Sequence, residues 1–213
     1  MKKMNVSHVL IAVSVCMAAC QSPQGKKGAS AEVDKNLITC EGIGEVKISD
    51  TYADLEKRFG AKALSEHENT ISGVYTSVWD GTSKQVNVFW KEKSAPFTHI
   101  KYLEVSADDS PYHTKDGFQI GLNTEEIQKL NGLMPLTFNN FYENVDPGQI
   151  VSFNGGTIEK EQPCIGGHLD MIDKKNIDIN EIRDFQKEKT VETTNRLLYR
   201  MDVRLTSIRV NNQ

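Results

Sequence analysis

The stretches VKISDTYADLEKRFG (residues 46–60) and FQIGLNTEEIQKLNG (residues 118–132) align with each other without a gap, at an offset of 72 residues. The matches are Ile48 with Ile120, Asp54 with Glu126, Leu55 with Ile127, Lys57 with Lys129 and Gly60 with Gly132. Self-similarity at a fixed spacing indicates a duplicated supersecondary unit. We therefore predict two copies of one small unit.

Each copy has the signals of a short helix with both ends marked. Thr51 in the first copy and Asn123 in the second are suited to cap a helix N-terminus, and acidic residues follow in the first turn. Gly60 and Gly132 are then expected to end each helix after about two turns. A helix this short is unstable alone, so each is expected to pack on a sheet.

Segments rich in β-branched and aromatic residues supply that sheet. The dipeptide Asp80-Gly81 predicts a hairpin between two of them. The expected strands are residues 73–79, 85–90 and 99–105 in the first copy, and residues 150–153, 167–172 and 203–210 in the second. The predicted fold is α+β, with two tandem units, each a short helix packed on an antiparallel meander sheet.

The last strand of each copy also repeats. IKYLEV (residues 100–105) lies over LTSIRV (residues 205–210) at an offset of 105, and both switch parity midway, as a β-bulge requires. Because the offset grows from 72 to 105, the second unit contains about 33 extra residues. We place the first unit at residues 40–112 and the second at residues 113–213, with an insertion at about residues 160–195.

The insertion is charged with mixed sign, and two interpretations of it stay open. Ile182 and Phe185 are three residues apart, as on one side of a short helix. The segment is either a solvated loop or an excursion that binds a partner, with Ile182 and Phe185 as the candidate binding residues.

The residues of the repeat carry a resemblance. The run from Ile120 to Gly132, and less closely that from Ile48 to Gly60, resembles the small outer-membrane-assembly lipoproteins of the SmpA/OmlA type. Two such units in tandem resemble the β-lactamase-inhibitor-protein fold. Ser49-Asp50 departs from the family, which usually has Gly-Met or a similar pair before the helix. The resemblance implies protein–protein binding through the sheet face and loops, without catalysis.

The N-terminal stretch MKKMNVSHVLIAVSVCMAAC (residues 1–20) has a basic start, a short apolar run and small residues before a cysteine. This is typical of a secretory signal, and its end resembles a bacterial lipobox. We predict a signal peptide over residues 1–19, lipidation of Cys20 and a flexible tether over residues 20–39. The lipid would anchor the chain in a bilayer of the cell envelope. The expected location is the outer membrane, facing the periplasm. An ordinary secretory signal or an uncleaved anchor is the alternative.

The net charge and the spacing of the histidine and acidic residues limit the classes of partner that the chain is expected to bind. The net charge is −4, and an acidic chain without a basic face is a poor candidate for nucleic acid. The histidines have no zinc-ligand spacing, and the Asp108-Asp109-Ser110 turn lacks the pattern of a calcium loop, so no metal and no cofactor is expected. An envelope protein partner of unknown identity is expected instead.

The cysteines beyond the signal leave a choice. In an oxidising compartment, Cys40 and Cys164 either form a disulfide or remain unpaired thiols. The run CIGGHLD (residues 164–170) also places a thiol near the imidazole of His168, as a nucleophile and its base would require. We expect a non-enzymatic binding protein; the alternatives are an envelope hydrolase that uses Cys164 and His168, and a lipoprotein that binds a small ligand or a glycan.

Overall fold

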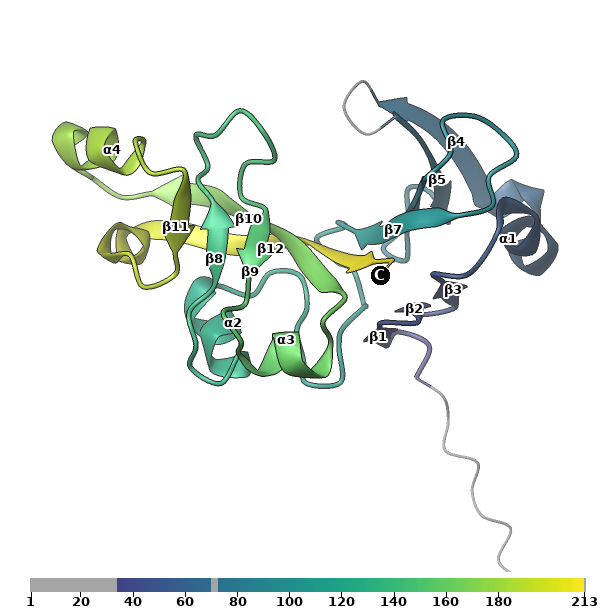
Figure 1. Ribbon diagram of the computed structural model, residues 1–213, viewed down its shortest axis with the longest axis horizontal. Helices are drawn as coiled ribbons and strands as arrows, with labels where there is room; N and C mark the ends of the chain where they lie inside the picture. The colour runs from purple at the N-terminus through teal and green to yellow at the C-terminus, as the bar shows by residue number, and fades with distance from the viewer. Residues whose placement is uncertain (1–33, 70–72, 213) are drawn as a thin grey trace, which may run out of the picture. The chain divides into compact units, whose positions relative to one another are not determined.

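The fold is α+β and is dominated by one antiparallel sheet of six strands in the order β10-β12-β7-β6-β5-β4 (Figure 1). A computed structural model describes residues 34–69 and 73–212. Its strands are β1 (Ile38–Thr39), β2 (Gly42–Ile43), β3 (Val46–Lys47), β4 (Leu64–Asn69), β5 (Gly73–Val78), β6 (Val86–Trp90), β7 (Ile100–Val105), β8 (Thr137–Asn139), β9 (Ile150–Ser152), β10 (Ile165–Lys174), β11 (Thr190–Glu192) and β12 (Met201–Asn211). Its helices are α1 (Tyr52–Phe59), α2 (Thr124–Leu130), α3 (Thr157–Glu161) and α4 (Ile179–Phe185), with short 3-10 helices η1 (Ala61–Ala63) and η2 (Arg196–Arg200).

The two repeated helices start in the same way. Thr51 caps α1 and Asn123 caps α2, and both form a capping box with an acidic residue three positions later, Asp54 or Glu126. In a capping box, each side chain accepts a hydrogen bond from the backbone of the other residue, which satisfies two N–H groups that a helix start leaves without partners. The predicted N-caps are therefore confirmed in both copies.

Each of these helices also buries one residue at the matching position. Leu55 is the buried residue of α1, and Ile127 that of α2; both are 0% exposed. Gly60 and Gly132, which follow the two helices, both have positive φ angles, +83° and +69°. Glycine adopts this conformation without steric cost.

The two copies join through their last strands. β7 and β12 are antiparallel, with Val105 opposite Ile208, Glu104 opposite Arg209 and Leu103 opposite Val210. At the offset of 105, Arg209 is the repeat equivalent of Glu104, so each copy presents the same position to the other. A local two-fold relation between the copies follows, as in an isologous interface. The two units therefore share one sheet, and their buried residues form one core.

The predicted bulges in these two strands are confirmed, and they occupy equivalent positions. β7 pairs with β6 through Tyr102 and then Ile100, so Lys101 is the extra residue. β12 pairs with β10 through Ser207 and then Leu205, so Thr206 is the extra residue. Lys101 and Thr206 are 105 positions apart, which extends the repeat to an irregular feature of the backbone.

The last residues of the segment predicted as a tether are folded. Residues 38–39 form β1, and the side chain of Ile38 is 0% exposed, because it packs into the hydrophobic core. β1 is further held by a hydrogen bond from the Ile38 N–H to the His113 carbonyl, at 2.8 Å. The end of the predicted tether is thus part of the folded unit, whereas residues 1–33, including the predicted signal peptide and Cys20, lie outside the described residues.

The extra residues of the second copy are also placed differently from the prediction. β10 lies within the predicted insertion but is a strand of the main sheet, equivalent to β6. Most of the additional chain lies between β10 and β12, where it forms α4, β11 and η2. β11 then pairs with β8 at the edge of a separate three-stranded sheet, β11-β8-β9.

Two arrangements matter for the site. In Figure 1, α2 and α3 lie on one side of β10 and β12, and the loop between β8 and β9 rises on the other side. A bridge between Gln149 and His168 connects this loop to β10.

Within residues 34–69 and 73–212, no helix has the length and apolar character needed to cross a membrane.

Candidate functional site

A row of aromatic side chains crosses the first half of the main sheet. The strand registers place His67 opposite Tyr75, Tyr75 opposite Phe89, and Phe89 opposite Tyr102. Directly opposed residues on antiparallel strands lie on the same face of a sheet, so the four rings form one line across β4, β5, β6 and β7. Neighbouring rings are stacked, with centroids 5.0, 4.9 and 4.3 Å apart along the row.

The aromatic row lies on the face opposite the aliphatic core. Strand alternation places Val88 and Leu103, both 0% exposed, on the other face. Trp90 shares that other face and stacks on Phe97, which also contacts Tyr52 of α1, so α1 covers the aliphatic side. Phe89 is 7% exposed, whereas Tyr75 and Tyr102 are half-buried.

The row ends in an ion pair that belongs to both copies. The Arg209 guanidinium lies 4.6 Å from the centre of the Tyr102 ring and is paired with the carboxylate of Glu104 at 2.5 Å. A guanidinium over an aromatic face is attracted by the ring quadrupole. The pair is mostly buried, with side-chain exposures of 18% for Arg209 and 13% for Glu104. Arg209 thus places a guanidinium, neutralised by Glu104, at the end of the aromatic row.

A polar cluster beside the row keeps this face well ordered. The Ser77 hydroxyl donates to Asn87 Oδ1 at 2.8 Å, and the Gln85 amide donates to the same oxygen at 2.9 Å. Ser77 and Asn87 are buried, and unpaired polar groups would be costly there. These side chains therefore satisfy one another's hydrogen-bonding groups next to the aromatic row.

The equivalent positions of the second copy, called here the second half, carry polar residues on β8, the loop before β9, β10 and β12. His168 lies opposite Ser207 just as Phe89 lies opposite Tyr102, and Gln149 lies opposite His168. The row continues to Asn139, whose N–H donates to the Gln149 carbonyl at 2.9 Å. The second half therefore has Asn139, Gln149, His168 and Ser207 in the positions of the four aromatic residues of the first half.

His168 is the titratable group of this polar row. Its Nδ1 lies 3.2 Å from the Ser207 hydroxyl. Burial lowers the pKa of His168, and the nearby positive charge of Arg209 lowers it further. Nearby carboxylates oppose this shift without reversing it. His168 is therefore mostly neutral near pH 7.

The predicted pair of cysteines is joined in the structure. Cys40 and Cys164 form a disulfide with Cα atoms 5.5 Å apart, which ties the segment after β1 to the start of β10. A nucleophilic cysteine must be a free thiolate. In the disulfide, Cys164 offers no such group to His168, so the Cys/His arrangement of the alternative hydrolase hypothesis lacks its nucleophile.

The candidate binding residues of the insertion are buried in the structure. Ile182 and Phe185 do lie on one side of a short helix, α4, as their spacing predicts, but they are only 9% and 3% exposed. The Asn140 amide donates to the Phe185 carbonyl at 2.7 Å, which holds the end of α4 on the loop after β8. Ile182 and Phe185 therefore anchor the insertion to the core.

The aromatic row was not predicted from the sequence. A signal was present, because Tyr75, Phe89 and Tyr102 alternate with residues that face the core in three successive strands. Their alignment depends on strand register, which the sequence did not determine.

Among the described residues, no group of three or more histidine, cysteine or acidic side chains is placed to hold a metal ion.

Comparison with known proteins gives no match: no family model, no curated protein and no solved structure is significantly similar to this chain. Function is therefore inferred from the geometry of the aromatic row.

Proposed function

We propose that this chain is a lipid-anchored protein of the bacterial cell envelope that binds another protein through the aromatic row, without catalysis. The observation that carries this proposal is the stack of His67, Tyr75, Phe89 and Tyr102 on the face opposite the core. Aromatic residues and arginine are enriched at the energetic centres of protein interfaces.

The order of the aromatic row favours a protein partner. Stacked rings supply apolar contact area and lose little conformational entropy on binding, because their neighbours already hold them. Arg209, held by Glu104, supplies a directional donor at one end of the row. This combination of rigid rings and a fixed guanidinium is suited to a partner surface with apolar side chains and an acidic group.

Variants of the accessible rings test this proposal. Affinity capture from crosslinked envelopes should recover a partner with the wild-type chain and lose it with the double variant Tyr75→Ala/Tyr102→Ala. The control is Tyr199→Ala, which removes a tyrosine that is 64% exposed on η2, outside the row. Equal capture by the double variant and the wild type would rule out the aromatic row as the binding surface.

The lipid anchor is tested separately. The small residues before Cys20 support lipidation at that position. We expect the Cys20→Ala variant to leave the membrane fraction or to remain unprocessed. Normal processing and membrane partitioning of the variant would contradict the anchor and leave the aromatic row unaffected.

A further inference from the structure

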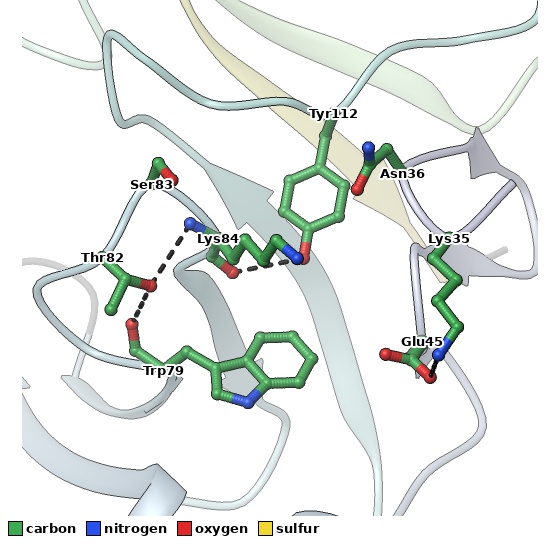
Figure 2. Close-up of a pocket in the computed structure, with 8 residues that line it drawn as sticks. All are labelled: Lys35, Asn36, Glu45, Trp79, Thr82, Ser83, Lys84 and Tyr112. Carbon is green, nitrogen blue, oxygen red and sulfur yellow. Dashed lines mark hydrogen bonds and ion pairs between the residues drawn. The ribbon is translucent and has the colours of Figure 1, made fainter.

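A second candidate site lies away from the aromatic row, beside the turn that joins β5 to β6. Figure 2 shows an open space bounded by the Trp79 ring, the Tyr112 ring and the Lys35–Glu45 pair. Its volume of about 390 Å³ is within the range of small-molecule sites. The lining comes from segments far apart in the sequence: the chain before β1, the β5–β6 turn and the connection between the two copies.

The indole of Trp79 forms one wall and is held in place from behind. Its ring packs edge-on against Phe59 of α1, with centroids 4.8 Å apart. Trp79 has a φ of +57°, an uncommon conformation for a bulky residue. The Thr82 hydroxyl donates to the Trp79 carbonyl at 2.7 Å, and this bond helps to fix the turn. A costly backbone conformation that directs a large aromatic ring toward a pocket is a reason to expect a binding role.

The opposite wall combines an aromatic ring with hydrogen-bonding groups. The Tyr112 hydroxyl donates to the Lys84 carbonyl at 3.2 Å. Burial raises the pKa of Tyr112 to about 12, so its hydroxyl stays protonated. Asn36 lies beside the Tyr112 ring in Figure 2 and offers an amide donor and an amide acceptor.

The charged groups of the pocket define the chemistry that it can accept. Lys35 and Glu45 form an ion pair at 3.2 Å, with side-chain exposures of 72% and 47%. Such an exposed pair contributes little to stability, so its two groups can re-pair with a ligand at low cost. Two neighbouring hydroxyls of a ligand can accept a hydrogen bond from the Lys35 ammonium and donate one to the Glu45 carboxylate. Lys84 adds a second ammonium, so these three groups have a net positive charge.

We propose that this pocket binds a sugar ring that carries a carboxylate, such as a uronic acid. The flat C–H face of a pyranose stacks on the Trp79 indole, and its hydroxyls bond to Asn36 and to the Lys35–Glu45 pair. The sugar carboxylate pairs with Lys84. A neutral sugar keeps the stacking and the hydroxyl bonds but loses the charge pairing, so the pocket discriminates between the two classes.

The chain contains its own reporter for the test. It has two tryptophans, Trp79 and Trp90, and the second is 6% exposed with its indole N–H donating to the Thr76 hydroxyl at 2.9 Å. A ligand in the pocket should therefore change the fluorescence of Trp79. The full chain in mild detergent is titrated with glucuronate, galacturonate and N-acetylneuraminate, with glucose and benzoate as comparators, and calorimetry gives an independent affinity.

We expect saturable binding of at least one acidic sugar, with about tenfold weaker binding of glucose. Lys84→Met should lower the affinity for the acidic sugar to that for glucose, whereas Lys91→Met, an exposed lysine at the other end of β6, should not. Trp79→Ala should abolish calorimetric binding, and Tyr75→Ala/Tyr102→Ala should leave it unchanged.

Three results would overturn the proposal. The first is the absence of saturable binding for all three acidic sugars, and the second is binding that survives in a folded Trp79→Ala variant. The third is tighter binding of benzoate than of any sugar, which would assign the pocket to aromatic carboxylates. Circular dichroism of each variant shows whether it is folded, and the Trp79→Phe variant tests the ring without opening a large cavity.

Discussion

The two copies of the repeated unit share a backbone plan but differ in the side chains that they place at matching positions. In the first half, His67, Tyr75, Phe89 and Tyr102 form a stacked aromatic row. In the second half, the matching positions hold Asn139, Gln149, His168 and Ser207. Caps, buried helix residues and bulges match between the copies, so the duplication specifies a scaffold.

The difference indicates which half carries recognition. A scaffold residue must satisfy packing or hydrogen bonding in both copies, as Leu55 and Ile127 do. The face of the sheet has no such requirement, so its residues can differ between the copies. Among the described residues the stacked aromatic row lies in the first copy, and this localises the proposed binding surface to the first half and to Arg209 at the junction.

The largest expected effect concerns the link between the halves. Replacing both cysteines, Cys40→Ser/Cys164→Ser, should lower the free energy of unfolding by about 4–5 kcal/mol, because the disulfide closes a long loop in the unfolded chain. Urea unfolding of the variant and of the reduced wild type measures this loss. A loss below about 1 kcal/mol in both would mean that the sheet and the shared core, without the disulfide, hold the halves together.

The next effect tests the equivalence of the helices. Leu55→Ala and Ile127→Ala should each cost about 3 kcal/mol, because each empties a fully buried site under a matching helix. Thermal and urea unfolding of the two variants gives the costs side by side. A harmless change at one position and a severe change at the other would break the structural comparison between the copies.

A smaller effect separates the two faces directly. Tyr102→Ala should cost about 2 kcal/mol, because it removes ring stacking with Phe89 and the contact with Arg209. Ser207→Ala, at the equivalent position of the second half, should cost less than about 1 kcal/mol. Urea unfolding measures both. Equal costs would show that the aromatic row contributes no more to the fold than the polar row.

The smallest effect is the pH response of the polar row. The pKa of folded His168 lies below its ordinary value because of burial and Arg209, so the unfolded chain binds the proton more readily. His168 therefore has no effect on the free energy of unfolding above about pH 6.5. As the pH falls below that value, His168 lowers the free energy of unfolding. Glu104, Asp146 and Asp170 oppose the shift, which limits its size.

The variant His168→Gln isolates this contribution. Unfolding free energies measured between about pH 7.5 and pH 5.5 should fall less steeply for the variant than for the wild type. Other titrating groups are common to both chains and cancel in the difference. A steeper fall in the variant would mean that the folded protein favours protonated His168.

The repeated parts of the fold could be predicted from the sequence. The repeated helices α1 and α2, their caps, and β5, β6, β7, β9, β10 and β12 follow from local signals such as Thr51, Gly60 and runs of β-branched residues. Strands β1 to β4, β8 and β11 were missed. β4 has a polar sequence, LSEHEN, and the others are two or three residues long, so their pairing depends on partners distant in the chain.

The candidate site was harder to predict than the fold, for a physical reason. Ile182 and Phe185 have the same apolar spacing whether their side of the helix meets a partner or the core, and the spacing cannot distinguish these cases. The aromatic row needs the registers of four strands at once, and a shift of one residue would turn a ring to the other face.

Site-specific photocrosslinking tests the central claim most directly. A photoreactive phenylalanine analogue is placed at Tyr75 in the first half and, in a separate variant, at the equivalent Gln149 in the second half. After irradiation of envelopes from cells that express the chain, we predict a defined crosslinked protein from position 75 and none from position 149. Crosslinking from position 149 alone would contradict the account and assign recognition to the polar half.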